Sequence, residues 1–181
     1  QNTQVSLDDF RGNPAPFSDA DEIAVCERCS IDRPSLRSVI AVESKGRGFD
    51  AETRLPIILY EPHIFSRRTK RAFDGSHPDL SYLQWKTLPY PKSQADRYDQ
   101  LIRAMRLDPV AALESCSWGM FQIMGFNWQA CGCKSLDDFM AKMLAGEAGQ
   151  MGLFESFIRS QGLLSKLQSG DWVGFAAGYN G

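Results

Sequence analysis

The sequence predicts one α+β domain that is predominantly helical and carries a small β-hairpin. The chain has 181 residues and a mass of 20.3 kDa, which suits a single domain with a sizeable core. Apolar residues recur at helical spacing along most of the chain, and one segment alternates with the period of a strand. The hydrophobic fraction of 43% and the charged fraction of 23% are those of an ordinary globular domain, which excludes disordered, collagen-like and membrane-spanning classes.

The amino-terminal end is polar and contains prolines, so residues 1–17 are predicted to form an irregular lead-in or linker. The folded domain is expected to span residues 18–181. Its first helix should cover residues 18–30, because Asp19 and Asp21 place acidic side chains in a first turn, where the helix dipole favours them.

A second helix is predicted to begin at an N-cap formed by Ser35. Apolar side chains then continue at the spacing of one helical face, and this face ends in Glu43. The residues of this face are Leu36, Val39, Ile40 and Glu43. Gly46 and Gly48 can take positive φ, so the helix should end within a turn of Glu43.

The strand-like segment covers residues 53–61 and is expected to form a small hairpin beside the second helix. Its alternation places four side chains on one side of the strand, namely Leu55, Ile57, Leu59 and Glu61. Pro62 limits the extension of the strand, and the proline-bearing stretch over 70–93 is predicted to be a long loop.

The rest of the chain is predicted to be mostly helical. Each remaining helix is indicated by an apolar stripe or by a capping residue. Apolar stripes run from Tyr98 to Met105 and through Phe154, Phe157 and Ile158. Asp108 is the cap and Pro109 the first residue of a helix through Leu113, and Ser135 and Asp138 form a capping box. Asp171 precedes a last helix through Ala177.

The overall charge gives no attraction to polyanions. The formal net charge is −2 and the sequence pI is near 5.7, so we expect neither a nucleic-acid partner nor a membrane. The basic cluster of Arg67, Arg68, Lys70 and Arg71 is interpreted as a solvated face, with contact to an anionic polymer as the alternative. The sequence lacks a signal peptide, and we expect it to be a piece of a longer protein.

Five cysteines form an odd set, so at least one must be a free thiol. They are Cys26, Cys29, Cys116, Cys131 and Cys133. The Cys-x-x-Cys and Cys-x-Cys pairs could suggest a metal site, but no histidine lies nearby. We favour buried thiols in a protein made in a reducing compartment, and we expect no metal and no cofactor.

Glu43 is the first candidate for acid chemistry. A carboxyl on an apolar stripe is desolvated, and at a helix C-terminus it faces the negative end of the dipole, so both effects raise its pKa. A raised pKa is what a general acid requires, as in glycoside hydrolysis, where a second, ionised carboxyl usually assists. The alternative is that Glu43 points into solvent.

Glu61 is the candidate for the second carboxyl, because its strand follows the helix of Glu43 through a glycine turn. The alternative for Glu61 is a strand-end glutamate in water or one paired with an arginine. Asp50 is a weaker candidate, because an aspartate beside glycine and phenylalanine is often a turn residue.

The segment Ser117 to Gly125 combines two glycines, large apolar side chains and one amide, so it is predicted to line a sugar cleft. The amide of Gln122 can both donate and accept hydrogen bonds, which fits acetamido and hydroxyl groups. The four apolar side chains are expected to belong to the core. They are Met120, Phe121, Ile123 and Met124.

Four blocks in order resemble the N-acetylmuramidase catalytic domain of phage endolysins and of some bacterial cell-wall-targeting effectors. They are Ala41-Val42-Glu43-Ser44 with Gly46, Gly48 and Phe49, then Leu59 to Phe65, Ser117 to Gly125, and Tyr179-Asn180-Gly181. The resemblance implies a lysozyme-like fold and cleavage of the β-1,4 bond after N-acetylmuramic acid, with Glu43 as the acid. It also implies that 18–181 is a catalytic domain truncated at its C-terminus.

The first functional hypothesis is a muramidase. Glu43 protonates the glycosidic oxygen, and Glu61 activates water or stabilises positive charge. The glycan is held by four further residues, namely Ser117, Gln122, Tyr179 and Asn180. The same blocks resemble goose-type lysozymes and lytic transglycosylases, so the second hypothesis is a lytic transglycosylase. The third is a peptidoglycan-binding module without turnover.

The expected partners follow from the resemblance. They are peptidoglycan glycan strands and, for a bacterial effector, an immunity protein, with the chain itself a monomer. We expect action in the periplasm or cell wall of a target bacterium. Delivery would then depend on a secretion system or on phage lysis machinery.

Overall fold

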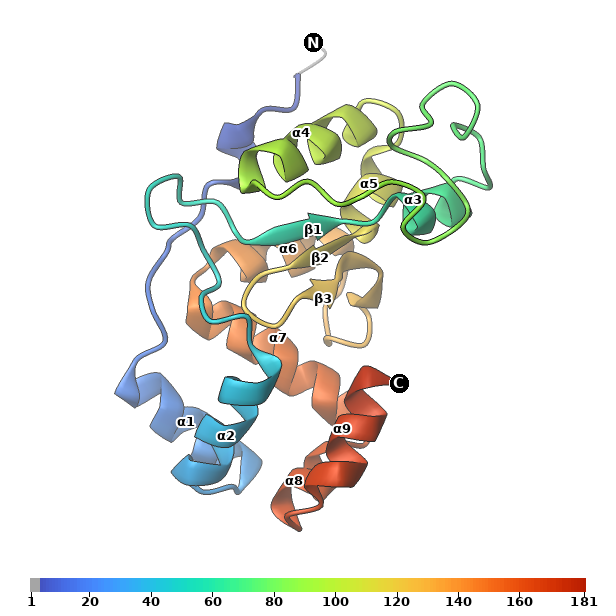
Figure 1. The fold of residues 1–181 in the computed structure, drawn as a ribbon. Helices are drawn as coiled ribbons and strands as arrows, with labels where there is room; N and C mark the ends of the chain where they lie inside the picture. The colour runs from blue at the N-terminus through green and yellow to red at the C-terminus, as the bar shows by residue number, and fades with distance from the viewer. Residues whose placement is uncertain (1–3) are drawn as a thin grey trace.

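The computed structural model describes residues 4–181, and these form a helix-rich fold with one small antiparallel sheet (Figure 1). The predicted α+β class is confirmed. In chain order the elements are η1 (Leu7–Phe10), α1 (Asp19–Cys29), α2 (Arg33–Glu43), β1 (Ile58–Tyr60), α3 (Pro62–Arg68), α4 (Gln94–Met105), α5 (Pro109–Glu114), β2 (Cys116–Trp118), β3 (Ile123–Met124), η2 (Gly125–Asn127), α6 (Leu136–Leu144), α7 (Glu147–Ser160), α8 (Leu164–Gln168) and α9 (Trp172–Asn180).

Helices α1 and α2 follow the predicted pattern with one correction. The side chain of Ser18 accepts a hydrogen bond from the backbone of Asp21 and caps α1, which ends at the left-handed Ser30. Helix α2 begins two residues before Ser35, because Asp32 is its N-cap and accepts from the Ser35 backbone at 2.7 Å. The helix ends at Glu43 as predicted.

The prediction of a hairpin at residues 53–61 is wrong, both in the length of the strand and in the segment with which it pairs. Strand β1 keeps only three residues and pairs with β2, and the hairpin of the sheet is the one that joins β2 to β3. The sheet order is β1-β2-β3. Ile58 and Tyr60 face the core, whereas the predicted stripe on Ile57 and Leu59 lies on the half-buried face.

The later helices begin close to where their capping residues predict. The caps Asp108, Ser135 and Asp171 each accept a backbone hydrogen bond at the start of α5, α6 and α9. Two short helices, α3 and α8, were not predicted, because each is shorter than two full turns of an apolar stripe. Helix α9 runs past the expected end at Ala177 to Asn180.

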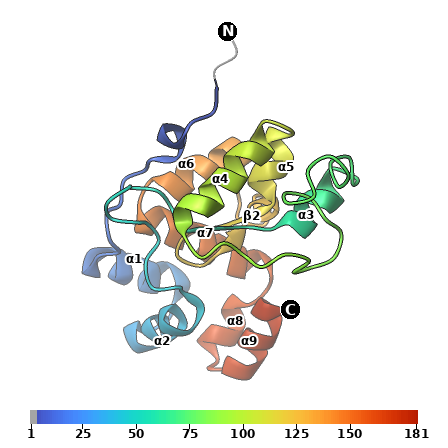
Figure 2. The same ribbon diagram turned by 45° about the horizontal axis from the view of Figure 1, so that its top comes forward.

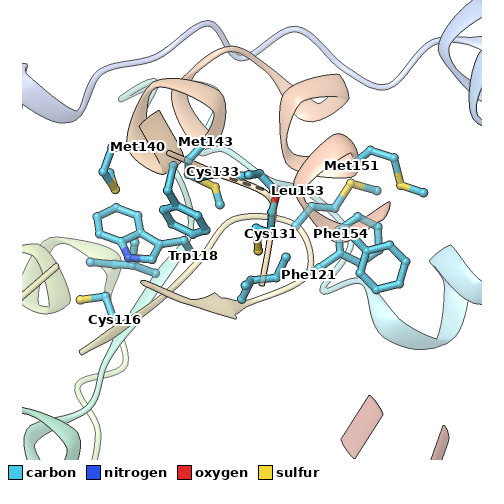
Figure 3. Packing of buried hydrophobic residues seen from close by; sticks show 14 of the residues in the cluster. Cys116, Trp118, Phe121, Cys131, Cys133, Met140, Met143, Met151, Leu153 and Phe154 are labelled. Atoms are coloured by element: carbon cyan, nitrogen blue, oxygen red, sulfur yellow. Dashed lines mark hydrogen bonds between the residues drawn. The ribbon is translucent and has the colours of Figure 1, made fainter. Parts of the chain in front are cut away.

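The core lies between the sheet and the helices that cover it. Helices α4 and α5 contact strands β1 and β2, and helices α6 and α7 pack against each other (Figure 2). Figure 3 shows buried side chains of β2, of the Cys131–Cys133 segment and of helices α6 and α7 gathered in one cluster. The rings of Phe121 and Phe154 stack at 4.0 Å and join the β2–β3 turn to α7.

The lead-in is only partly irregular. Residues 1–3 of the predicted lead-in lie outside the described residues. The remainder contains η1, and Phe10 is buried with its ring 5.9 Å from the rings of both Tyr98 and Trp118. An aromatic anchor therefore ties this segment to the core.

All five cysteines are free thiols, four of them buried and Cys26 half-buried, as the sequence favoured. Burial raises the pKa of each of them, and that of Cys29 reaches about 11. None of the helices between residues 4 and 181 combines the length and apolarity that a membrane crossing needs.

Candidate active site

A cleft of about 470 Å³ opens where the end of α2, the β2–β3 turn and α9 meet. In Figure 1, the end of α9 points toward β3. The cleft is therefore lined by residues from α2, early in the chain, and from α9, at its end. The lining residues are Val42, Glu43, Lys45, Phe121, Gln122, Ile123, Met124, Asn127, Phe157, Ala176, Tyr179 and Asn180. Met124, predicted as core, is half-buried in this wall.

Glu43 is the last residue of α2, and its half-buried side chain faces the cleft. Burial raises the pKa of its carboxyl above the usual 4.5, while the nearby Lys45 ammonium acts in the opposite direction. Within residues 4–181 the Glu43 side chain makes no hydrogen bond and no ion pair. A carboxyl in this setting can keep a proton and remains free to donate it to a ligand.

Gln150 of α7 fixes the cleft wall next to Glu43. Its side chain is 1% exposed and accepts a hydrogen bond from the backbone of Met120 at 2.7 Å. Its amide donates to the carbonyls of Met143 (3.2 Å) and Gly48 (3.4 Å). The segment after Glu43 and the β2–β3 turn are thereby held to one helix.

The close approach of Gln150 explains two glycines of the sequence motifs. A Cβ added to Gly48 would lie 2.0 Å from the Gln150 carboxamide oxygen, and one added to Gly119 would lie 2.7 Å from it. Gly119 also has φ +74, which favours glycine. The sequence interpretation missed Gln150, and the two glycines were the available signal.

Glu147 assists Gln150 from the first turn of the same helix. Its carboxylate accepts hydrogen bonds from the backbones of Gly48 (2.7 Å) and Phe17 (3.1 Å). The loop after Glu43 is therefore anchored through both its N–H and its carbonyl groups, which limits how far the acid can move.

Gln122 lies in the cleft wall as predicted, but its amide is already used inside the protein. The Gln122 nitrogen donates to the carbonyls of Ile57 (3.1 Å) and Gly119 (2.9 Å), and its oxygen accepts from Ser117 (2.9 Å). Gln122 also has φ +51. These contacts shape the turn, and the buried Ser117 hydroxyl does not reach the cleft.

Tyr179 and Asn180 line the opposite wall, on the last turn of α9. The Tyr179 hydroxyl donates to the carbonyl of Phe121 at 3.3 Å, and its ring stacks against Phe175 at 5.9 Å. Asn180 is exposed and donates from its nitrogen to the carbonyl of Ala176, which leaves its side-chain oxygen available. Tyr179 thus mainly fixes α9, and Asn180 is the more accessible polar group.

Glu61 does not line this cleft. It follows β1 and is the N-cap residue of α3, with a side chain that is 15% exposed. Tyr90 donates a short hydrogen bond to its carboxylate, and the His63 Nδ1 atom lies 3.3 Å away without the alignment of a hydrogen bond. Burial raises the Glu61 pKa, while the Tyr90 hydrogen bond and Lys86 lower it.

The sheet register nevertheless directs Glu61 toward the cleft side. Leu59 lies opposite Ser117, and Ser117 lies opposite Met124, so these side chains share one face of the sheet. Glu61 follows Leu59 by two residues, and its N–H continues the ladder by donating to the Ser115 carbonyl at 2.9 Å. Glu61 therefore shares the sheet face of Met124, which lines the cleft.

Asp50 is a turn residue. Its carboxylate accepts hydrogen bonds from the backbones of Glu52 (3.0 Å) and Thr53 (2.9 Å), and these bonds lower its pKa. Its carboxylate thus stabilises the turn, and Asp50 does not line the cleft. Over the part of the chain that the structure describes, no three His, Cys, Asp or Glu side chains cluster in the manner of a metal site.

The sequence interpretation also missed His63, Tyr90 and Asn127. Tyr90 lies in the long loop, where no periodicity marks any residue, and Asn127 lies in η2 directly after the glycine-rich segment. His63 belongs to the motif around Glu61 but was given no role. Its pKa is lowered by burial and by Arg67, so it is neutral near pH 7.

Comparison with known proteins gives a family and a structural neighbour. The family model described as Muramidase, N-acetylmuramidase, matches residues 32–181. The crystal structure of the Burkholderia AP3 phage endolysin superposes with a TM-score of 0.82 at 37% sequence identity. The match covers 93% of this chain and 64% of the endolysin chain, so this chain spans less than two thirds of that protein. No curated protein matches.

Proposed function

The chain belongs to the N-acetylmuramidase family, and on that premise we propose that it hydrolyses the β-1,4 bond between N-acetylmuramic acid and N-acetylglucosamine in peptidoglycan. The observation that carries this proposal is Glu43, a half-buried carboxyl with a raised pKa on the wall of an open cleft. Such a group suits protonation of a glycosidic oxygen.

The reaction needs a proton donor and stabilisation of positive charge. Glu43 gives its proton to the leaving oxygen as the bond breaks, and positive charge develops on the sugar ring. Glu61 is the second carboxylate in this proposal, where it activates water or stabilises that charge. The hydrogen bond from Tyr90 favours its ionised form.

The glycan would be held mainly by accessible polar groups of the cleft. Asn180 offers its free amide oxygen, and Lys45 and Asn127 line the same wall. We assign Gln122 and Ser117 to the support of the turn, because their polar atoms are already hydrogen-bonded. The substrate proposed for the chain places its action in the bacterial cell wall.

Replacement of the acid tests the proposal. Glu43→Gln keeps the shape of the side chain but removes the proton, so lysis of purified sacculi should fall about 10²–10⁴-fold. Glu27→Gln is a matched control on α1, where the side chain is exposed. Lysis by Glu43→Gln at the wild-type rate would refute the role of Glu43.

A second function is favoured by one observation. Among residues 4–181, Glu43 is the only carboxylate that lines the cleft, and a lytic transglycosylase needs one glutamate. That enzyme would return an anhydro-sugar through attack by the hydroxyl of the muramic acid itself. Mass spectrometry of the released muropeptides distinguishes the two reactions, since hydrolysis adds one water to each reducing end.

A further inference from the structure

The long loop carries exposed apolar side chains close to Glu61. Trp85 is 61% exposed, Leu88 43% and Leu83 41%. A large ring left in water loses the free energy that burial would give, so an exposed tryptophan beside a proposed site is a candidate contact surface. These three apolar side chains have no role in the chemistry described above.

Hydrogen bonds fix the Trp85 ring in place. Its indole nitrogen donates to the Tyr90 hydroxyl at 2.9 Å, and that hydroxyl donates to the Glu61 carboxylate. A single phenolic oxygen therefore separates the indole N–H from the carboxylate. The ring is held by its edge, and the residue remains largely exposed.

Lys86 adds a positive charge at the same place. Its backbone has φ +56, and its ammonium lies 4.4 Å from the centre of the Trp85 ring. A cation above an indole is attracted by the negative face of the ring. The pair therefore combines an apolar surface with a charge that attracts carboxylates.

The sheet register connects this pair to the cleft. Met124 lines the cleft and shares a sheet face with Glu61, and two strand spacings of about 4.8 Å each separate their strands. A glycan strand that leaves the Glu43 cleft across this face reaches the end of β1. Trp85 lies next to this end, because Tyr90 is hydrogen-bonded to both Trp85 and Glu61.

We propose that Trp85 and Lys86 form a saccharide-binding subsite at the Glu61 end of the glycan path. The C–H face of a β-linked N-acetylhexosamine packs on the indole, whose ring face is negative. Lys86 attracts the lactyl or stem-peptide carboxylate of a muramic acid unit. This inference rests on the proposed function, because it presumes that the ligand is peptidoglycan glycan.

Binding can be measured without turnover in a Glu43→Gln background. The probe is a soluble hexasaccharide of alternating N-acetylglucosamine and N-acetylmuramic acid, and the method is isothermal titration calorimetry. Trp85→Ala should weaken binding roughly tenfold, the size of one aromatic stacking contact. Trp85→Phe keeps a ring and should lose less. Ile23→Ala is a control for an exposed apolar side chain on α1.

The outcomes separate this inference from the proposed function. Equal affinity of the Trp85→Ala variant and its parent would overturn the subsite and leave the muramidase assignment standing. No binding by the parent itself would overturn both. Thermal unfolding of each variant shows whether it is folded, and the high exposure of Trp85 predicts an unchanged melting temperature.

Discussion

The two candidate carboxyls occupy contrasting regions of the molecule. Glu43 ends a helix, faces an open cleft and has no hydrogen-bond partner among residues 4–181. Glu61 ends a strand, is 15% exposed and is fixed by Tyr90 with His63 beside it. One carboxyl is free to exchange a proton with a ligand, and the other is oriented by its neighbours.

The two groups differ in what opposes the effect of burial on their pKa values. Burial raises the pKa of both carboxyls. For Glu43 the opposing effect is the nearby charge of Lys45, and for Glu61 it is a direct hydrogen bond from Tyr90 together with the charge of Lys86. A hydrogen bond to the charged form stabilises it more specifically than a solvent-exposed charge does. Both pKa values are raised, so the proposed division into an acid and a carboxylate rests on the different partners of the two groups.

After the Glu43→Gln exchange, the largest expected effect comes from removing the second carboxylate. If Glu61 assists hydrolysis, Glu61→Gln should lower the rate of sacculus lysis by about 10²-fold, because charge stabilisation or water activation is lost while the acceptor for Tyr90 remains. Turbidity measurements suffice, with the exposed Glu52→Gln as a control. Full activity with anhydro products would instead favour the one-glutamate transglycosylase.

The support of the Glu43 region can be weakened separately. Gln150→Ala leaves the buried Met120 N–H without its partner and should lower the free energy of unfolding by about 1–3 kcal/mol. Urea denaturation measures the change, and the exposed Gln129→Ala is a matched control. A stability equal to that of the control would show that Gln150 does not hold this wall.

Removing the Tyr90 hydroxyl tests the orientation of Glu61. Its hydrogen bond lowers the Glu61 pKa, so Tyr90→Phe should raise that pKa. As the pH falls, a carboxylate with a raised pKa becomes protonated earlier. If Glu61 works in its ionised form, the rate therefore begins to fall at a higher pH, and the acidic limb of the pH–rate profile moves upward. A profile identical to that of the wild type would mean that Glu61 does not act as a carboxylate.

Replacing Lys45 tests the pKa of Glu43 in the corresponding way, and it should have the smallest effect of these changes on activity. Its charge lowers the Glu43 pKa, so Lys45→Met should raise it. In the proposed mechanism Glu43 works in its protonated form, so the basic limb of the pH–rate profile moves upward. The shift should be small, since Lys45 is exposed and solvent screens its charge. Movement of the acidic limb instead would assign the two groups the other way round.

Local signals in the sequence were sufficient to predict much of the structure around Glu43. Helix α2 ends at Glu43 because the apolar stripe and the following glycines specify it, and the caps Ser135 and Asp171 act within one turn. The pairing of β1 with β2 was missed, because it joins segments far apart in the chain, whose register no local pattern encodes.

The Glu61 region was harder to predict for the same physical reason. Its partner Tyr90 lies in a loop without periodicity, and only the folded chain brings that loop over β1. Gln150 likewise contacts two segments that are distant in the chain, at Gly48 and Met120, so its role is visible in the sequence only through the glycines that accommodate it. Residues that act through non-local contacts leave few local traces.

The proton on Glu43 can be observed directly by NMR titration of its side-chain carboxyl carbon, with the signal assigned by its loss in Glu43→Gln. We predict a Glu43 pKa above the ordinary 4.5, because burial outweighs the charge of Lys45. A pKa at or below 4.5 would contradict the role of Glu43 as the proton donor.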